Sequence, residues 1–131
     1  MKNGYNPMRW DCEKDGCFNK KCRPKIEVFA ECFPGRIGFG DLDAIVEIGG
    51  RKCALEWKSI TDDLPIGQMI TFRSLVRDDK FTIFCVVGDA ETMEVSHVGT
   101  FNSSGEFEGY REANLSDLKI KLREWVSNGN L

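Results

Sequence analysis

The chain has 131 residues, of which 41% are hydrophobic and 30% are charged, and its net charge is −3. This length is enough for one domain with a real hydrophobic core, so we expect a single domain over residues 1–131. No apolar run approaches the roughly 18 residues of a membrane span, and no secretion signal is evident, which predicts a soluble, cytoplasmic protein. The net charge excludes a basic coat over the whole surface.

Residues 1–23 are polar, contain three cysteines and show no clear periodicity. The stretch PKIEVFAECF, which begins at Pro24, predicts a short helix with an apolar stripe, because proline is favoured in the first turn of a helix. Pro34 and Gly35 then stop the helix.

The next two elements are expected to form a hairpin. They are RIGFGDLDAIVEI (residues 36–48) and RKCALEWKS (residues 51–59), joined by Gly49 and Gly50. A diglycine is typical of a two-residue hairpin turn. The numbers of facing residues then sum to 99, as those of the two glycines do.

This register predicts which side chains share a face, because neighbours in a strand alternate. Glu47 faces Lys52, as a cross-strand ion pair would. One face is expected to carry Leu42, Ala44, Val46, Ile48, Cys53, Leu55 and Trp57. The other face is expected to carry Asp41, Asp43, Glu56 and Lys58.

The rest of the chain predicts two more helices and two more strands. Residues 66–77 carry apolar side chains at helical spacing, and the apolar run 81–88 predicts a strand buried on both faces. Residues 91–101 are expected to form a strand, 103–109 a loop and 114–129 a helix. The first of these helices is long enough for a right-handed crossover between parallel strands. The sequence therefore predicts an α/β domain with a mixed sheet.

Two acidic side chains face each other in the predicted hairpin, Asp43 and Glu56. Like charges at this spacing are destabilising, so a cation is expected between them. Converging carboxylates suit a hard divalent cation such as Mg²⁺. Lys58, on the same face, could act on a metal-bound water or stabilise charge on a phosphate. The pattern indicates phosphodiester hydrolysis, and the alternative is a structural network of ion pairs.

The stretch GDLDAIVEIGGRKCALEWKS, residues 40–59, resembles the core of the PD-(D/E)XK nuclease superfamily, and small phage-encoded and prophage-encoded members in particular. The resemblance implies a restriction-endonuclease-like α-β-β-β-α-β core, with a mixed central sheet flanked by helices. It implies a nuclease that uses Mg²⁺ or Mn²⁺, in the host cytoplasm if phage-encoded. We expect its substrate to be DNA, with RNA as the alternative. The metal ligands that it implies are Asp43, Glu56 and Trp57. The catalytic residues that it implies are Asp43, Glu56, Lys58 and Gln68.

Gln68 resembles the glutamine that several branches of this superfamily place after the E-x-K strand, although a polar residue at a helix N-terminus is the alternative. Such enzymes often use a further carboxylate from the first helix, for which Glu27 and Glu31 are candidates, and a solvated helix face is the alternative. Asp41 is either a helper ligand or the partner of Lys58.

The basic residues gather near the N-terminus. Residues 1–40 carry eight Lys and Arg against five Asp and Glu, whereas residues 41–131 carry ten against sixteen. A segment that tracks nucleic-acid phosphates and a merely solvated surface both agree with this pattern. The candidate nucleic-acid-binding residues are Lys20, Lys21, Arg23 and Lys25.

Four cysteines could hold a structural zinc or an iron–sulfur cluster: Cys12, Cys17, Cys22 and Cys32. Their spacing differs from the close pairs of zinc ribbons, and we expect reduced, unligated thiols. His97 lies in a predicted strand and is not expected to act as a ligand or a base.

Two alternatives to the nuclease remain open at this level. One is a catalytically silent nucleic-acid-binding protein on the same fold, and the other is a phage-type module that acts through protein contacts. The sequence leaves the oligomeric state open, a dimer included.

Overall fold

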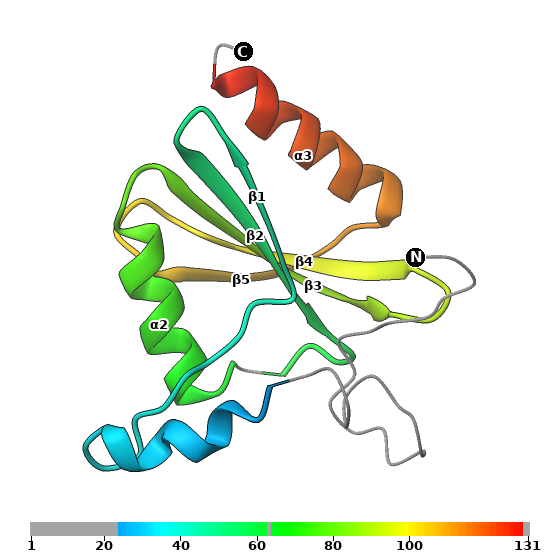
Figure 1. Cartoon of the computed structure of the whole chain (residues 1–131). Coiled ribbons are helices and arrows are strands. Elements are labelled where there is room, and N and C mark those ends of the chain that lie inside the picture. Colours follow the sequence, from blue (N-terminus) through cyan, green and yellow to red (C-terminus); the bar gives the residue numbers. More distant parts are fainter. Residues whose placement is uncertain (1–23, 63, 130–131) are drawn as a thin grey trace. The chain divides into compact units, whose positions relative to one another are not determined.

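The computed structural model describes residues 24–62 and 64–129 (Figure 1). The chain divides into two compact units, with the boundary between Asp41 and Leu42. The second unit contains a five-stranded sheet and two α-helices. Its elements are β1 (Ala44–Ile48), β2 (Arg51–Lys58), α2 (Ile66–Val76), β3 (Phe81–Asp89), β4 (Glu94–Phe101), β5 (Phe107–Glu112) and α3 (Leu115–Asn128).

The helix predicted from Pro24 is present in the first unit as a 3-10 helix, η1 (Ile26–Cys32), and it buries none of its residues. The expected apolar stripe therefore does not pack as a buried helix face. Two of its rings instead meet Phe39 edge-on, with ring centroids 5.9 Å apart for Phe29 and 5.3 Å apart for Phe33.

The sheet is mixed, in the order β1-β2-β3-β4-β5. Strands β2 and β3 are parallel and all other neighbours are antiparallel. The α2 helix makes the crossover between the parallel pair, as the sequence predicts. Two helices cover the sheet, α2 on one face and α3 on the other (Figure 1). The predicted α/β class with a mixed sheet is confirmed. Within the described residues two strands, β1 and β2, precede α2.

The β1–β2 hairpin has the predicted register, and Ile48 pairs with Arg51 across the turn. Gly49 and Gly50 both have positive φ, 59° and 89°. A two-residue hairpin turn of this kind requires positive φ at both positions, which glycine adopts without steric cost. The turn chemistry therefore sets the pairing of the two strands.

The expected ion pair between Glu47 and Lys52 is wrong in detail. The two residues face each other, but both side chains bond to the turn: Glu47 Oε2 accepts from the Gly50 N–H at 2.7 Å, and Lys52 Nζ donates to the Gly50 carbonyl at 3.2 Å. The exposed peptide groups of the turn need partners, and these two side chains supply them.

Strand β3 is buried on both faces, as predicted, and it divides the core into two clusters. The cluster on the α3 side contains Cys53, Phe84, Val86, Val95, Val98, Leu118 and Trp125. The cluster on the α2 side contains Ala54, Leu64, Phe72, Val76, Ile83 and Cys85. Leu42 packs against the second cluster, whereas it was expected on the face of Ala44. The reason is that β1 begins only at Ala44, so strand alternation does not extend to Leu42.

The expected loop over residues 103–109 is wrong at its C-terminal end, because β5 begins at Phe107. The turn before it is shorter: the Asn102 side chain accepts from the backbone N–H groups of Ser104 and Glu106, each at 3.0 Å. The sequence FEGYRE is polar and contains Gly109, so it lacks a strong strand pattern of its own. Pairing with β4 makes it a strand.

The closing helix α3 begins at a capping box. The Asn114 side chain accepts from the Asp117 N–H, and the Asp117 side chain accepts from the Asn114 N–H, both at 2.9 Å. At its other end, Arg51 Nη2 donates to the Trp125 carbonyl at 2.9 Å. Among the helices that the structure describes, none has the length and apolar character to cross a membrane.

Candidate functional site

Strand β2 carries an acidic and a basic side chain, Glu56 and Lys58, toward the α2 face of the sheet. Alternation dictates this, because Ala54, two residues earlier, belongs to the core cluster on that face. Glu56 is only 6% exposed. A carboxylate at this depth needs hydrogen-bond donors to offset its lost hydration.

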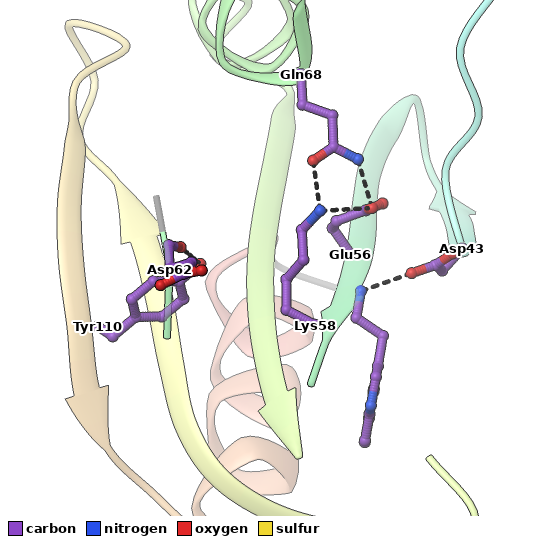
Figure 2. Close-up of polar contacts among 7 residues, drawn as sticks. Asp43, Glu56, Lys58, Asp62, Gln68 and Tyr110 are labelled. Carbon is purple, nitrogen blue, oxygen red and sulfur yellow. Dashed lines mark hydrogen bonds and ion pairs between the residues drawn. The ribbon is translucent and has the colours of Figure 1, made fainter. Parts of the chain in front are cut away.

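Gln68, in the first turns of α2, supplies one of these donors and connects the two charged side chains (Figure 2). Its Nε2 donates to Glu56 Oε1 at 2.6 Å, and its Oε1 accepts from Lys58 Nζ at 2.7 Å. Lys58 Nζ lies 3.7 Å from Glu56 Oε1. The glutamine amide therefore makes the shorter contact with each charged group, and the ammonium and carboxylate also form an ion pair.

Asp43 reaches the same strand from the other side, just before β1. Its Oδ2 accepts a hydrogen bond from the Trp57 N–H at 2.6 Å. The N–H of Lys52 points to β3, where it bonds to the Lys80 carbonyl, and strand alternation then directs the N–H of Trp57 to the β1 side. Regular pairing of β1 with β2 ends at Ala44 and Leu55. Beyond that point the Asp43 carboxylate, in place of a backbone carbonyl, accepts the hydrogen bond from the Trp57 N–H.

The Trp57 indole is directed to the opposite face of the sheet, where it packs against the α3-side cluster and its Nε1 donates to the Gly88 carbonyl at 3.0 Å. The indole therefore takes no part in the network around Glu56. The peptide groups of one strand residue point to the same side, so the Trp57 carbonyl is directed toward the Asp43 side of β2. Only this carbonyl could serve the metal-ligand role that the sequence assigns to Trp57.

Cys85 on β3 is the register partner of Glu56 and is fully buried. Burial, and to a smaller extent the negative charge of Glu56, raise the pKa of its thiol to about 12 against the opposing positive charge of Lys58. The thiol is therefore protonated at neutral pH. The surroundings of Glu56 on β3 are thus neutral and apolar. A hydrogen bond is stronger in such surroundings, so the bond from Gln68 to Glu56 contributes more to stability than it would in water.

The structure brings together four of the predicted site residues, Asp43, Glu56, Lys58 and Gln68, all within the second unit. Lys58 was expected to pair with Asp41 in one interpretation; within the second unit its Nζ contacts Gln68 and Glu56. Four other candidates belong to the first unit: Lys25, Glu27, Glu31 and Asp41. Their expected roles stay predictions.

Other candidates lie outside the described residues: Cys12, Cys17, Cys22, Lys20, Lys21 and Arg23. The fourth cysteine of the proposed cluster, Cys32, is exposed on η1. His97 lies on β4, as expected, and its Nδ1 is 3.0 Å from the hydroxyl of Ser96.

One contact near the site was not foreseen. The hydroxyl of Tyr110 on β5 donates to the Asp62 carbonyl at 3.2 Å (Figure 2). Asp62 lies in the connection between Lys58 and Gln68, so this hydrogen bond links β5 to that connection at Asp62. The sequence carries no signal for this contact, because Tyr110 and Asp62 are 48 residues apart and no local pattern pairs them.

The donor set around β2 fits a hard divalent cation. Asp43 and Glu56 offer carboxylate oxygens and Trp57 offers a carbonyl, and Mg²⁺ and Mn²⁺ both favour oxygen ligands of this kind. Within residues 24–62 and 64–129 no three His, Cys, Asp or Glu side chains are grouped closely enough to hold a metal ion by themselves. A cation here would complete its shell with water or phosphate oxygens, as Mg²⁺ commonly does.

Comparisons of this chain with protein-family models, with curated proteins and with solved structures found no match. A function can therefore be inferred only from the chemistry of the side chains that the fold brings together.

Proposed function

We propose that this protein is a divalent-metal-dependent nuclease that hydrolyses nucleic-acid phosphodiester bonds, with DNA as the expected substrate and RNA as the alternative. One observation carries the proposal: Gln68 bridges the buried carboxylate of Glu56 and the ammonium of Lys58. The second carboxylate, Asp43, bonds to the residue between them. Such a combination of acids and a lysine suits charge development on a phosphate.

Each residue has a distinct role in this proposal. Asp43, Glu56 and the carbonyl of Trp57 would hold Mg²⁺ or Mn²⁺, which supplies an activated water and polarises a phosphoryl oxygen when bound. Lys58 stabilises the negative charge that builds up on the phosphate in the transition state. An ammonium has three donor hydrogens, and Gln68 uses one of them, so Lys58 keeps donors for the substrate.

Gln68 is a positioning residue in this proposal. Without it, Lys58 and Glu56 could close the 3.7 Å between Nζ and Oε1 into a shorter direct pair. The lysine would then be drawn toward the carboxylate and away from a phosphate. The amide holds the two groups apart with one donor and one acceptor, and it adds no charge of its own.

The restriction-endonuclease-like core belongs to the same proposal. Its support is the succession of the β1–β2 hairpin, the α2 crossover and the parallel strand β3, with the acid and the E-x-K residues on the hairpin. The proposed α-β-β-β-α-β order has three strands before the crossover helix, and the described residues have two. The hairpin and crossover are therefore the part of that core which supports the proposal.

The test is cleavage of linear, circular and single-stranded DNA and of RNA with Mg²⁺, with Mn²⁺ and with EDTA. Wild type is expected to cleave DNA only when a metal is present. Lys58→Ala should lower cleavage by about 100-fold or more, because it removes transition-state stabilisation, while DNA binding changes only a few-fold. Lys80→Ala, at an exposed lysine outside the network, is the matched control and should cleave like wild type. Near-normal cleavage by Lys58→Ala would overturn the assignment.

The alternative is a catalytically silent nucleic-acid-binding or phage-type protein-interaction module on the same fold. The mutual hydrogen bonding of Glu56, Gln68 and Lys58 favours it, because such a network can be purely structural. The same panel separates the two functions. Metal-independent DNA binding without cleavage would favour silent binding, and absence of binding at low salt, where phosphate contacts are strongest, would favour a protein partner.

A further inference from the structure

The outer face of α2 carries aliphatic side chains where a surface helix normally carries polar ones. Ile66 is 80% exposed and Ile70 is 64% exposed. Two arginines, Arg73 in the last turn and Arg77 at the C-cap, are also exposed. Large exposed aliphatic groups beside cations on one helix indicate a surface that binds another molecule.

These four side chains form one stripe. Their spacings of four, three and four residues place them on the same side of an α-helix. The buried residues of α2, Phe72 and Val76, lie on the side that packs against the sheet. The stripe of Ile66, Ile70, Arg73 and Arg77, called the outer stripe below, therefore faces away from the core.

The outer stripe is cationic in an acidic part of the chain. Residues 41–131 carry sixteen Asp and Glu against ten Lys and Arg, yet Ile66–Val76 contains no acidic residue. Among the described residues, neither Arg73 nor Arg77 forms an ion pair with a carboxylate. The next carboxylate along the chain, Asp78, accepts from the Lys80 N–H at 3.0 Å. The two guanidinium groups therefore keep their charge available for an anionic partner.

The same helix carries Gln68, which lies between Ile66 and Ile70 in the sequence. Its side chain points to the sheet and the candidate site. The outer stripe begins at that level and extends along the helix for roughly 16 Å, at about 1.5 Å per residue. Its arginines are about 6 Å apart along the axis, which spans about two phosphate steps of a B-form strand. The outer stripe lies on the side of α2 opposite Gln68, so a nucleic acid that leaves the site has to pass around the first turn of the helix, and it would then meet both arginines.

We propose that the outer stripe binds the nucleic-acid substrate beyond the cleavage site. Arg73 and Arg77 contact phosphates, for which the guanidinium fork is well suited. Ile66 and Ile70 contact sugars or base faces, as apolar side chains of other nucleic-acid-binding proteins do. This inference rests on the proposed function, because it assigns a path to the substrate of the same site.

The first test measures how DNA affinity depends on salt. Fluorescein-labelled single-stranded and duplex oligonucleotides are titrated in EDTA between 50 and 200 mM NaCl, so that no cleavage occurs. The double variant Arg73→Gln/Arg77→Gln should reduce the slope of log affinity against log salt by about 1.4 for single strands and about 1.8 for duplex. Affinity near physiological salt should fall about tenfold.

The chain offers a matched control on α3. Lys119 and Arg123 are also exposed and also four residues apart, but their helix covers the other face of the sheet. Lys119→Gln/Arg123→Gln removes the same charge at the same spacing. Its slope should stay within about 0.5 of wild type. Equal slopes for the two double variants would overturn the proposal.

The second test addresses the aliphatic half of the outer stripe. Ile66→Ser/Ile70→Ser should lower affinity for single-stranded DNA by about three- to tenfold without changing the salt slope, because no charge is lost. Its oligomeric state, measured by light scattering, should match that of wild type. A change of oligomeric state with unchanged DNA binding would overturn the proposal and assign the stripe to contacts between copies of the chain.

The tests distinguish failure of the outer stripe from failure of the nuclease, because binding in EDTA does not depend on cleavage. A protein that binds DNA through Arg73 and Arg77 but never cleaves it supports the stripe and overturns the nuclease. If the protein cleaves DNA and the Arg73→Gln/Arg77→Gln variant has the salt slope of wild type, only the proposal about the outer stripe is overturned.

Discussion

Gln68 donates a hydrogen bond to Glu56 Oε1 over 2.6 Å, so that a residue near the start of α2 holds a buried carboxylate on β2. Glu56 lies on the first strand of the parallel pair, and Gln68 lies on the crossover helix that follows it. The contact therefore couples the packing of α2 on the sheet to the geometry of the candidate site.

Gln68→Met should destabilise the protein. The substitution keeps most of the side-chain volume. It removes the amide N–H that donates to Glu56 and the amide oxygen that accepts from Lys58, which leaves a buried carboxylate with fewer hydrogen bonds. The free energy of unfolding should fall by about 1–3 kcal/mol, measured by urea denaturation.

Thr71→Val, on the same helix, serves as the control for this loss. The Thr71 hydroxyl donates to the Gly67 carbonyl at 3.0 Å in an exposed setting, so its removal should change stability by less than about 0.5 kcal/mol. Similar losses for both variants would mean that Gln68 contributes no more than an ordinary surface hydrogen bond.

Divalent metal should stabilise the wild-type protein. A cation that binds only the folded state adds about 1.4 kcal/mol at ten times its dissociation constant. The melting temperature should therefore rise by roughly 4–8 °C when EDTA is replaced by Mg²⁺ or Mn²⁺ at that concentration. Differential scanning calorimetry measures the shift.

Asp43→Asn should lose most of this metal-dependent shift. An asparagine oxygen can still accept from the Trp57 N–H, as Asp43 Oδ2 does, so the hairpin is preserved while one ligand charge is removed. In EDTA the variant should fold with the circular dichroism spectrum of wild type. A full shift in the variant, or none in wild type, would speak against a metal at this position.

Gly99→Ala should be strongly destabilising, because Gly99 makes room for two aromatic rings of β5. A Cβ at Gly99 would lie 2.6 Å from the ring of Phe107 and 3.0 Å from the ring of Tyr110. Overpacking of this kind costs about 1–3 kcal/mol. Gly67→Ala, where nothing lies within 4 Å of the added Cβ, should instead leave stability unchanged or raise it by up to about 1 kcal/mol. The order of the two melting temperatures checks the prediction.

The buried cysteines should resist alkylation in the folded protein. Burial raises the pKa of Cys53 to about 11 and that of Cys85 to about 12, whereas Cys32 is exposed. Only the thiolate reacts, so iodoacetamide at pH 8 should label Cys32 before Cys53 and Cys85. Peptide mapping by mass spectrometry measures the rates, and labelling in urea should remove the difference. Equal native rates would contradict the burial of the two strand cysteines.

Alkaline pH should weaken the fold partly through Cys85. Its folded pKa of about 12 exceeds the ordinary thiol pKa of 9.0, so the unfolded state releases this proton first. The stabilising contribution is complete below about pH 9 and is lost as pH rises toward 12. The free energy of unfolding should therefore decline less steeply between pH 9 and about 10.5 in Cys85→Ala than in wild type. Parallel declines would show that this thiol is not protected in the fold.

The sequence by itself determined the elements whose signals are local. The positive φ that Gly49 and Gly50 provide specifies a two-residue turn, and the turn sets the register of β1 on β2. The apolar run at 81–88 indicated a strand covered on both faces, and helical spacing located α2 and α3. These features follow from backbone sterics and from side-chain period, which neighbouring residues encode.

Only the tertiary structure decided the features that depend on a distant partner. β5 has a weak pattern of its own and exists through pairing with β4. Asp43 was predicted opposite Glu56. Its hydrogen bond from the Trp57 N–H depends on where the pairing of β1 with β2 ends, which the sequence pattern does not specify. The Gln68 bridge requires α2 to pack at one level over β2. Hydrogen bonds of this kind need atoms placed to within a few tenths of an ångström, and packing between elements supplies that placement where sequence spacing does not.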